Sequence, residues 1–221
     1  MNSFVKIFIF LIISAVIVCG IVLPIPHIPA LGDKARVLYF HVPMSWISVL
    51  AFFMSMYYSI KFLKTREIDY DIKSFSSAQL GFLFCVLATL TGSLWAKFNW
   101  GSFWNWDPRQ TSIFILLLIY GAYFALRSAI DSEEQRARLS AVYSIIAAVT
   151  VPFFVFIMPR IVESLHPDPI INTSGKINMD TTMFIIFLTS LLGFTLLFLW
   201  CLNLKVRIER VSLKHLRSVV D

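Results

Sequence analysis

Two of the four histidines in the chain stand where they could act as a pair. His41 lies in "RVLYFHVPMSW" at the start of a long apolar run, and His166 follows another apolar run in "ESLHPDP". Neutral imidazole is the commonest side-chain ligand of metal ions. The other two, His27 between prolines and His215 in the basic C-terminal tail, are typical of surface positions.

A pair of histidines favours haem over zinc. A zinc site needs three or four ligands, and the cysteines Cys19, Cys85 and Cys201 lie in separate apolar runs without CxxC spacing. Haem iron needs only one or two axial side chains, since the porphyrin supplies the other ligands. Taken singly, each histidine is also explained by a hydrogen-bonded ring at a membrane interface.

The stretch "WAKFNWGSFWNWDPRQT", residues 95–111, offers flat aromatic surface suited to a flat ligand. It holds four of the six tryptophans, namely Trp95, Trp100, Trp104 and Trp106. Arg109 within this stretch and Arg36, five residues before His41, could pair with haem propionates because a guanidinium binds a carboxylate bidentately. An aromatic belt at a membrane interface is the alternative explanation.

The same stretch carries two local structural signals. The spacing of Trp100 and Trp104 predicts an amphipathic helix on the membrane surface that presents both rings on one face. Asp107 followed by Pro108 predicts the start of the next helix, because aspartate caps free amides and proline suits the first turn.

The composition indicates that a membrane surrounds these residues. Of the 221 residues, 58% are hydrophobic and only 14% are charged, whereas a soluble domain has about 25% charged residues. Six segments are long and apolar enough to span a bilayer as helices. They cover Phe4–Leu23, Val42–Leu63, Ser77–Trp95, Thr111–Ala129, Leu139–Met158 and Thr181–Leu204. We expect the first to be retained, since it lacks a small-residue cleavage site.

The basic residues predict the orientation of these spans. With the N-terminus inside, thirteen of the 19 lysines and arginines lie on the cytoplasmic side, which the positive-inside rule favours. The thirteen are Lys6, Lys61, Lys64, Arg66, Lys73, Arg127, Arg136, Arg138, Lys205, Arg207, Arg210, Lys214 and Arg217. This placement explains the net charge of +6 through membrane lipid, without nucleic acid.

The expected fold is therefore an all-α integral membrane protein, a bundle of six transmembrane helices forming one domain over residues 1–221. Both termini are expected in the cytoplasm, with a Trp-rich amphipathic segment on the outer face. Three outer loops, which contain His41, residues 95–111 and His166, then open on one side of the membrane.

Three motifs resemble one family of haem-handling proteins. "WGSFWNWD" is similar to the W-G-x-x-W-x-W-D signature of the WWD family of cytochrome c assembly, which includes CcmC, CcmF and CcsA-type proteins. "RVLYFHVPMSW" resembles the R-x-x-Y-x-H-V-P stretch before the second helix of CcmC proteins, and "ESLH" resembles their second histidine site. Six spans in 221 residues also suit CcmC.

The resemblance implies a haem-delivery role in the bacterial cytoplasmic (inner) membrane, facing the periplasm. Such proteins hold haem b transiently between two histidines, here His41 and His166. They hand it to the chaperone CcmE, beside the transporter subunits CcmA and CcmB and the small CcmD. The platform for haem and chaperone would comprise Trp95, Trp100, Gly101, Trp104, Trp106 and Asp107. Arg36 and Arg109 would face the propionates.

Other functions remain open at this point. The protein is expected to deliver haem rather than act as an enzyme, but "WDP" also occurs in CcsA-type synthases, which attach haem directly to apocytochrome c. A structural or transport role would leave the tryptophans as an interface belt. A b-type electron-transfer subunit would need histidines within the spans, whereas His41 and His166 lie at their ends.

Overall fold

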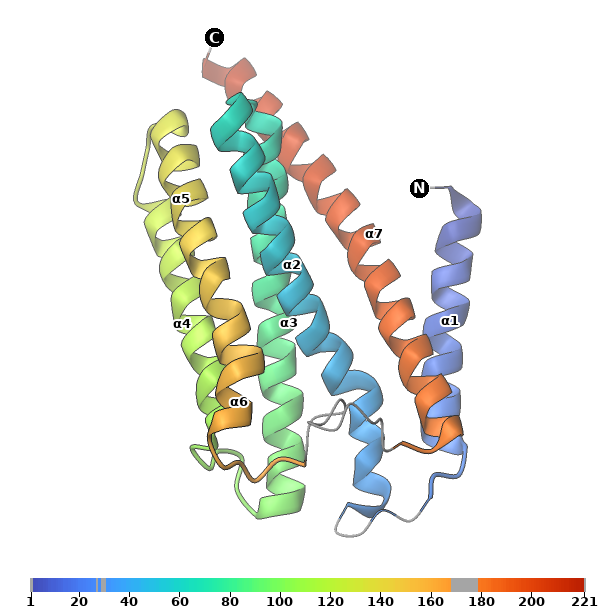
Figure 1. The fold of residues 1–221 in the computed structure, drawn as a ribbon. Coiled ribbons are helices and arrows are strands. Elements are labelled where there is room, and N and C mark those ends of the chain that lie inside the picture. Colours follow the sequence, from blue (N-terminus) through green and yellow to red (C-terminus); the bar gives the residue numbers. More distant parts are fainter. Residues whose placement is uncertain (1, 27, 29–30, 168–178, 221) are drawn as a thin grey trace.

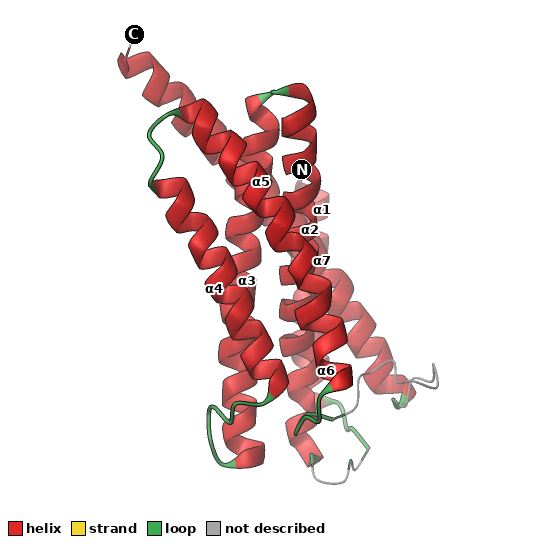
Figure 2. Ribbon diagram, turned by 60° about the vertical axis from the view of Figure 1, so that its left-hand side comes forward, coloured by secondary structure: helices red, strands yellow, loops and turns green. Residues whose placement is uncertain are grey.

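The computed structural model describes residues 2–26, 28, 31–167 and 179–220, so His27 lies outside the described residues. Within these ranges the regular structure is entirely helical (Figures 1 and 2). The elements are α1 (Ser3–Val22), η1 (Gly32–Val37), α2 (Leu38–Thr65), α3 (Ile68–Trp100), α4 (Pro108–Ser128), α5 (Glu133–Pro152), η2 (Phe153–Ile157), α6 (Met158–Ile161) and α7 (Thr181–Val220).

Six helical segments in the described residues are long and apolar enough to cross a membrane, which confirms the predicted number of spans. They are Ser3–Val22, Gly32–Thr65, Ile68–Trp100, Pro108–Ser128, Glu133–Ile161 and Thr181–His215. Many side chains on their outer surfaces are large, apolar and exposed, Phe10 and Leu90 among them. This is the arrangement that lipid contact favours.

Several helices extend beyond the apolar segments that predicted them. α3 begins at Ile68 rather than Ser77 and ends at Trp100 rather than Trp95, and α7 continues through the basic tail. Hydropathy marks only the lipid-embedded part of a helix, whereas backbone hydrogen bonding continues into polar sequence. Asp69 and Asp71 suit the first turn of α3 because they complement the positive end of the helix dipole.

The helices α2 and α3 form the centre of the molecule (Figure 1). α4 and α5 pack on one side of this pair, and α1 and α7 on the other. Small residues allow the close approach: a Cβ on Gly81 would come within 2.7 Å of the Phe52 ring. Buried serines join α2, α3 and α5, with Ser55 Oγ lying 2.9 Å from Ser144 Oγ and 3.1 Å from Ser74 Oγ. Such hydrogen bonds commonly stabilise the packing of membrane helices.

The described connections gather at two opposite ends of the bundle (Figure 1). One end, here called the loop end, carries η1, the loop 101–107 and the segment 162–167. The other end carries both termini and the two short turns that join α2 to α3 and α4 to α5. The expected site residues therefore lie in these segments or in the neighbouring turns of α2, α3 and α4.

A π-helical turn interrupts the last helix before His166. Residues 153–157 form η2 between α5 and α6, and Pro152 and Pro159 flank it. Proline removes a backbone donor and disturbs the regular ladder, and a π turn is frequent at functional sites. The chain leaves α6 at Val162 in an extended conformation and reaches His166 four residues later.

Candidate functional site

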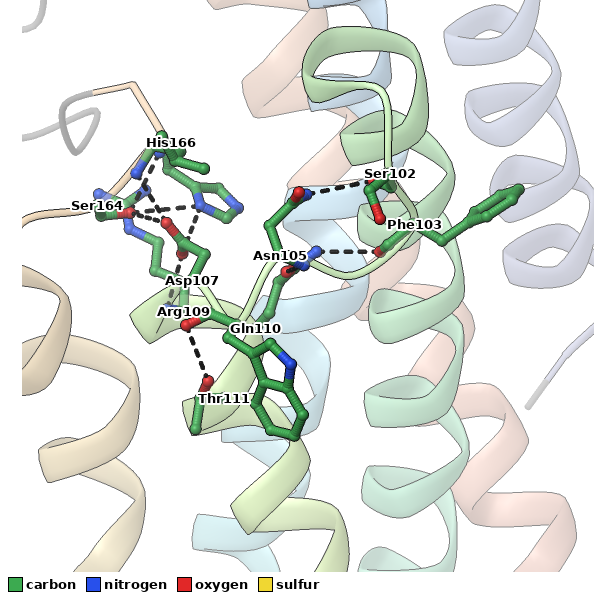
Figure 3. Close-up of polar contacts among 11 residues, drawn as sticks. Ser102, Phe103, Asn105, Asp107, Arg109, Gln110, Thr111, Ser164 and His166 are labelled. Atoms are coloured by element: carbon green, nitrogen blue, oxygen red, sulfur yellow. Dashed lines mark hydrogen bonds and ion pairs between the residues drawn. The ribbon is translucent and has the colours of Figure 1, made fainter.

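Asp107 fastens the segment that carries His166 to the start of α4 (Figure 3). His166 Nδ1 lies 2.9 Å from Asp107 Oδ1, and the Leu165 amide donates to Asp107 Oδ2 at 2.7 Å. The Ser164 hydroxyl donates to the same Oδ2 at 2.9 Å. The carboxylate also accepts from the Arg109 amide at 2.9 Å, so it caps α4 as the sequence predicted.

The electrostatics of this cluster favour the neutral form of His166. Burial lowers the pKa of His166, Asp107 opposes that effect, and the nearby Arg109 cation adds to it, leaving the pKa below its usual value. Burial raises the pKa of Asp107, but hydrogen bonds from the Arg109 and Leu165 amides and from Ser164 outweigh burial and lower it overall. A histidine that binds a metal must be neutral, and a carboxylate is a common partner of its other ring nitrogen.

Two tryptophans of α3 surround His166. The Trp95 ring stacks on the imidazole with centroids 5.7 Å apart and planes inclined by 29°. The Trp100 ring meets it edge-on at 4.8 Å, and the two indoles contact each other at 5.0 Å. Within the described residues, the buried Trp95 Nε1 has no hydrogen-bond partner. The wall beside His166 is therefore aromatic with one available donor.

His41 is held against the same helix, one turn earlier. Its Nδ1 lies 3.0 Å from Thr91 Oγ1. The ring packs on Gly92 so closely that a Cβ at this position would come within 2.8 Å of His41 Cε1. Pro43, two residues later, lies inside α2 and has no N–H to offer the Tyr39 carbonyl, which accepts from the buried Ser190 hydroxyl instead.

α3 therefore brings the two histidines together. His41 contacts Thr91 and Gly92, whereas His166 contacts Trp95 and Trp100. Thr91 and Trp95 are four residues apart in one helix, so they are neighbours on one face, about 6 Å apart along the axis. Two residues separated by 125 positions in the chain thus share one wall.

The other two tryptophans form a separate group, and the predicted surface helix is wrong. α3 ends at Trp100, and Gly101 takes the left-handed conformation (φ 81°) that stops a helix. Residues 101–107 form a loop, so Trp100 and Trp104 do not share a helical face. Trp104 instead contacts Trp106 at 5.8 Å and Phe114 at 5.9 Å.

This loop is held back onto α4 by Gln110, whose amide side chain is buried (Figure 3). Its Oε1 accepts from the Asn105 amide at 2.9 Å, and its Nε2 donates to the Phe103 carbonyl at 3.2 Å. Trp106 has a left-handed backbone (φ 56°) and a largely exposed side chain. The loop thus presents Trp106 outward while Trp100 faces the histidine.

The two arginines expected near propionates differ in their surroundings. Arg36 donates from Nη1 to the carbonyls of Gly20 and Leu23 and from Nε to Asp33, so it joins η1 to the end of α1. Arg109, in the first turn of α4, lies close enough to His166 to influence its pKa. Of the two, Arg109 is the cation beside the histidine and tryptophan cluster.

The structure adds residues that sequence reasoning missed: Thr91, Gly92, Gln110 and Ser164. A glycine inside an apolar helical run is a weak signal of close packing, and "LTGSLW" carried it. The partners of Thr91 and Ser164 depend on tertiary contacts 50 and 57 residues away, and no local pattern shows them.

Comparison with known proteins places this arrangement in a family. The family described as "Heme exporter protein C" matches residues 1–220. "Heme exporter protein C" of Bradyrhizobium diazoefficiens is 31% identical over 188 residues, covering 85% of this chain and 71% of its own. A "Putative cytochrome c biosynthesis ccmC-like mitochondrial protein" of Marchantia polymorpha is 32% identical over 159 residues, covering 71% and 67%.

A second group of relatives is matched over a shorter region. "Cytochrome c biogenesis protein CcsA" of Cuscuta reflexa is 33% identical over 88 residues, which are 39% of this chain but only 29% of that protein. The match to heme exporter protein C, in contrast, extends along almost the whole chain. This multi-pass membrane protein therefore belongs to the CcmC family of cytochrome c biogenesis, the heme exporter protein C family.

Proposed function

We propose that this chain, as one transmembrane domain over residues 1–221, holds haem b as transient cargo between His41 and His166 and delivers it to the chaperone CcmE. The loop end would face the periplasm from the bacterial inner membrane. CcmA, CcmB and CcmD would complete a transporter-like complex around it. The role is delivery by iron coordination, without covalent chemistry of its own.

One observation carries the proposal: both histidines are fastened through Nδ1 and packed on adjacent turns of α3. His41 Nδ1 meets Thr91 Oγ1 at 3.0 Å, and His166 Nδ1 meets Asp107 Oδ1 at 2.9 Å. A ligating histidine usually donates its other ring N–H to such a partner, which fixes the tautomer and the ring orientation. The Nε2 atoms are then the ones available to iron.

The surroundings also suit the chemistry of haem. Trp95 and Trp100 supply flat apolar surface beside His166, and Arg109 supplies a cation for a propionate. The exposed Trp106 and Phe103 lie next to this group in the chain and offer apolar surface for a chaperone. Arg36, held by two carbonyls and Asp33, would act on a propionate only through its remaining amino group.

The test is the spectrum of the purified protein. Haem-loaded protein should show low-spin iron with two histidine ligands, and His41→Ala and His166→Ala should each lose most of the haem. Imidazole added to either variant should restore part of the low-spin spectrum. His215→Ala, in the tail at the opposite end, is the matched control and should keep its haem. Full haem content in both site variants would contradict the ligand assignment.

The second candidate function is a CcsA-type cytochrome c synthase, which the 88-residue match to CcsA proteins favours. Such an enzyme would attach haem directly to an apocytochrome. Co-expression with an apocytochrome c in cells lacking CcmE separates the two functions. Under the delivery proposal no covalent cytochrome forms, and its formation would favour the synthase.

A further inference from the structure

We infer that the two histidines are unequal ligands of the haem iron. His166 is the stronger ligand, and His41 is the ligand that leaves the iron when haem is transferred to the partner. The inference rests on the proposed function, because it assumes that both rings bind the iron. It concerns the partners behind the rings, which differ in charge and in their number of hydrogen bonds.

Behind His166 stands an ionised carboxylate. Asp107 accepts the Nδ1–H of His166 at 2.9 Å, and its side chain is completely buried. A carboxylate partner withdraws the Nδ1 proton toward itself and makes Nε2 a stronger electron donor to a metal. Asp107 is itself fixed by three further donors, namely the amides of Arg109 and Leu165 and the hydroxyl of Ser164.

Behind His41 stand neutral acceptors, the hydroxyl of Thr91 and the backbone of Ala88. Thr91 Oγ1 directs its own hydrogen to the carbonyls of Leu87, at 2.8 Å, and Ala88, at 3.1 Å. Its oxygen therefore accepts the Nδ1–H of His41 at 3.0 Å. A neutral acceptor polarises the ring less than a charged one, since charge-assisted hydrogen bonds are about twice as strong. His41 is thus oriented through a neutral partner and is the weaker donor.

This difference in ligand strength determines the order in which the two histidines release the iron during haem transfer. When a ligand atom of the partner reaches the iron, the bond between the iron and one histidine nitrogen breaks as the bond to the new ligand forms, and no electron is transferred. The bond to His41 breaks first, and its Nδ1 proton stays in place on the hydrogen bond to Thr91. His166 keeps the haem attached until the partner holds it. Thr91 and Asp107 act through the histidines and are positioning residues.

The first test reconstitutes each single-histidine variant with haem and then measures how fast the haem leaves, with apomyoglobin as the acceptor. His41→Ala, which retains His166, should release haem more slowly than His166→Ala. Adding Asp107→Asn should speed release about tenfold in the His41→Ala background and leave it unchanged in the His166→Ala background. Asparagine still caps a helix, so α4 is preserved. Equal acceleration in both backgrounds, or faster release from His41→Ala, would overturn the inference.

The second test keeps both histidines and therefore does not depend on weakened variants. Carbon monoxide added to the reduced, haem-loaded protein displaces the weaker ligand, and the C–O stretch then reports on the histidine that remains. Asp107→Asn should shift this frequency, whereas Thr91→Val should leave it unchanged. The reverse pattern would show that His166 yields first. Failure of the proposed function is distinct, because wild-type protein would then lack the two-histidine spectrum before any comparison.

Discussion

Asp107 shows how one side chain serves two parts of the molecule. Its Oδ1 accepts from the Arg109 amide and from His166, and its Oδ2 accepts from Ser164 and the Leu165 amide. A helix cap alone needs one of these bonds. The additional three connect the start of α4 to a segment 57 to 59 residues further along the chain. Asp107, the residue that ends the tryptophan motif, therefore positions His166.

Local sequence could predict only part of this site. The histidine pair, the cap at Asp107 and Pro108, and the presence of an aromatic wall all follow from residue type and local order. The contact between Asp107 and His166 does not, because it depends on how two loops meet. The assignment of Trp95 and Trp100 to one group and Trp104 and Trp106 to another also needed the backbone turn at Gly101.

Gly92 gives a sharp prediction at the scale of single residues. An alanine there would place its Cβ within 2.8 Å of His41 Cε1, and the ring cannot retreat without losing its bond to Thr91. We expect Gly92→Ala to weaken haem binding by about tenfold or more while the helix itself is retained. Haem titration followed by absorbance measures the effect.

The matched control for Gly92 is Gly121→Ala in α4, because a Cβ at Gly121 meets no other atom within 4 Å. Both changes replace glycine by the best helix former, so they share the same effect on helix propensity, about 1 kcal/mol in favour of folding. Haem affinity should be unchanged in the control. Equal affinities in the two variants would show that Gly92 does not position His41.

At the scale of elements, apolar patterns predict where helices cross a membrane but not where they end. α2 ends before Arg66, whose backbone is left-handed (φ 61°). α3 begins two residues later, at Ile68, in the sequence "IDYDIK", half of whose residues are charged. That early start places Asp71 inside the bundle, where it pairs with Arg127 of α4. Hydropathy alone assigned Asp71 to a loop because it ignores such pairing.

The pair of Asp71 and Arg127 predicts a large effect on stability. Their side chains are 6% and 11% exposed, Arg127 Nη1 lies 2.8 Å from Asp71 Oδ1, and the guanidinium stacks over Phe75. Asp71→Asn leaves a buried arginine without its counter-charge, which costs about 3–5 kcal/mol. Thermal unfolding in detergent should show the loss, and Asp71→Leu combined with Arg127→Met should recover much of it.

Asp69, two residues earlier in α3, is the control for this prediction. It pairs with Lys73 and Arg210, but its side chain is 38% exposed. Exposed ion pairs contribute about 0–1 kcal/mol, so Asp69→Asn should change the unfolding temperature little. If Asp69→Asn and Asp71→Asn destabilise the protein equally, burial is not what gives the Asp71 pair its importance.

At the scale of the whole molecule, the two ends of the bundle are chemically different. The end with both termini carries most of the basic side chains. Lys64 and Arg127 lie in the last turns of α2 and α4, Arg136 lies near the start of α5, and Arg210 pairs with Asp69 at the start of α3. The loop end carries His41, His166 and the four tryptophans of residues 95–106, and its cations in the described part of the chain are fewer: Lys34, Arg36, Lys97, Arg109 and Arg160. A cavity of about 550 Å³ beside Asp71, Arg127 and Glu209 lies at the basic end, away from the histidine site. The positive-inside rule therefore predicts that the loop end faces outward.

Labelling of introduced cysteines with a membrane-impermeant maleimide tests this orientation. Ser102 lies in the loop 101–107 and Glu67 in the turn between α2 and α3, and both are exposed. Ser102→Cys should react in intact spheroplasts, whereas Glu67→Cys should react only after permeabilisation. The unsubstituted protein gives the background from Cys19, Cys85 and Cys201, which are half-buried or buried. Because the two new thiols are similarly exposed, a difference reports the side of the membrane rather than burial. If only Glu67→Cys is labelled in intact spheroplasts, the topology is the inverse of the predicted one and the haem site faces the inside of the cell.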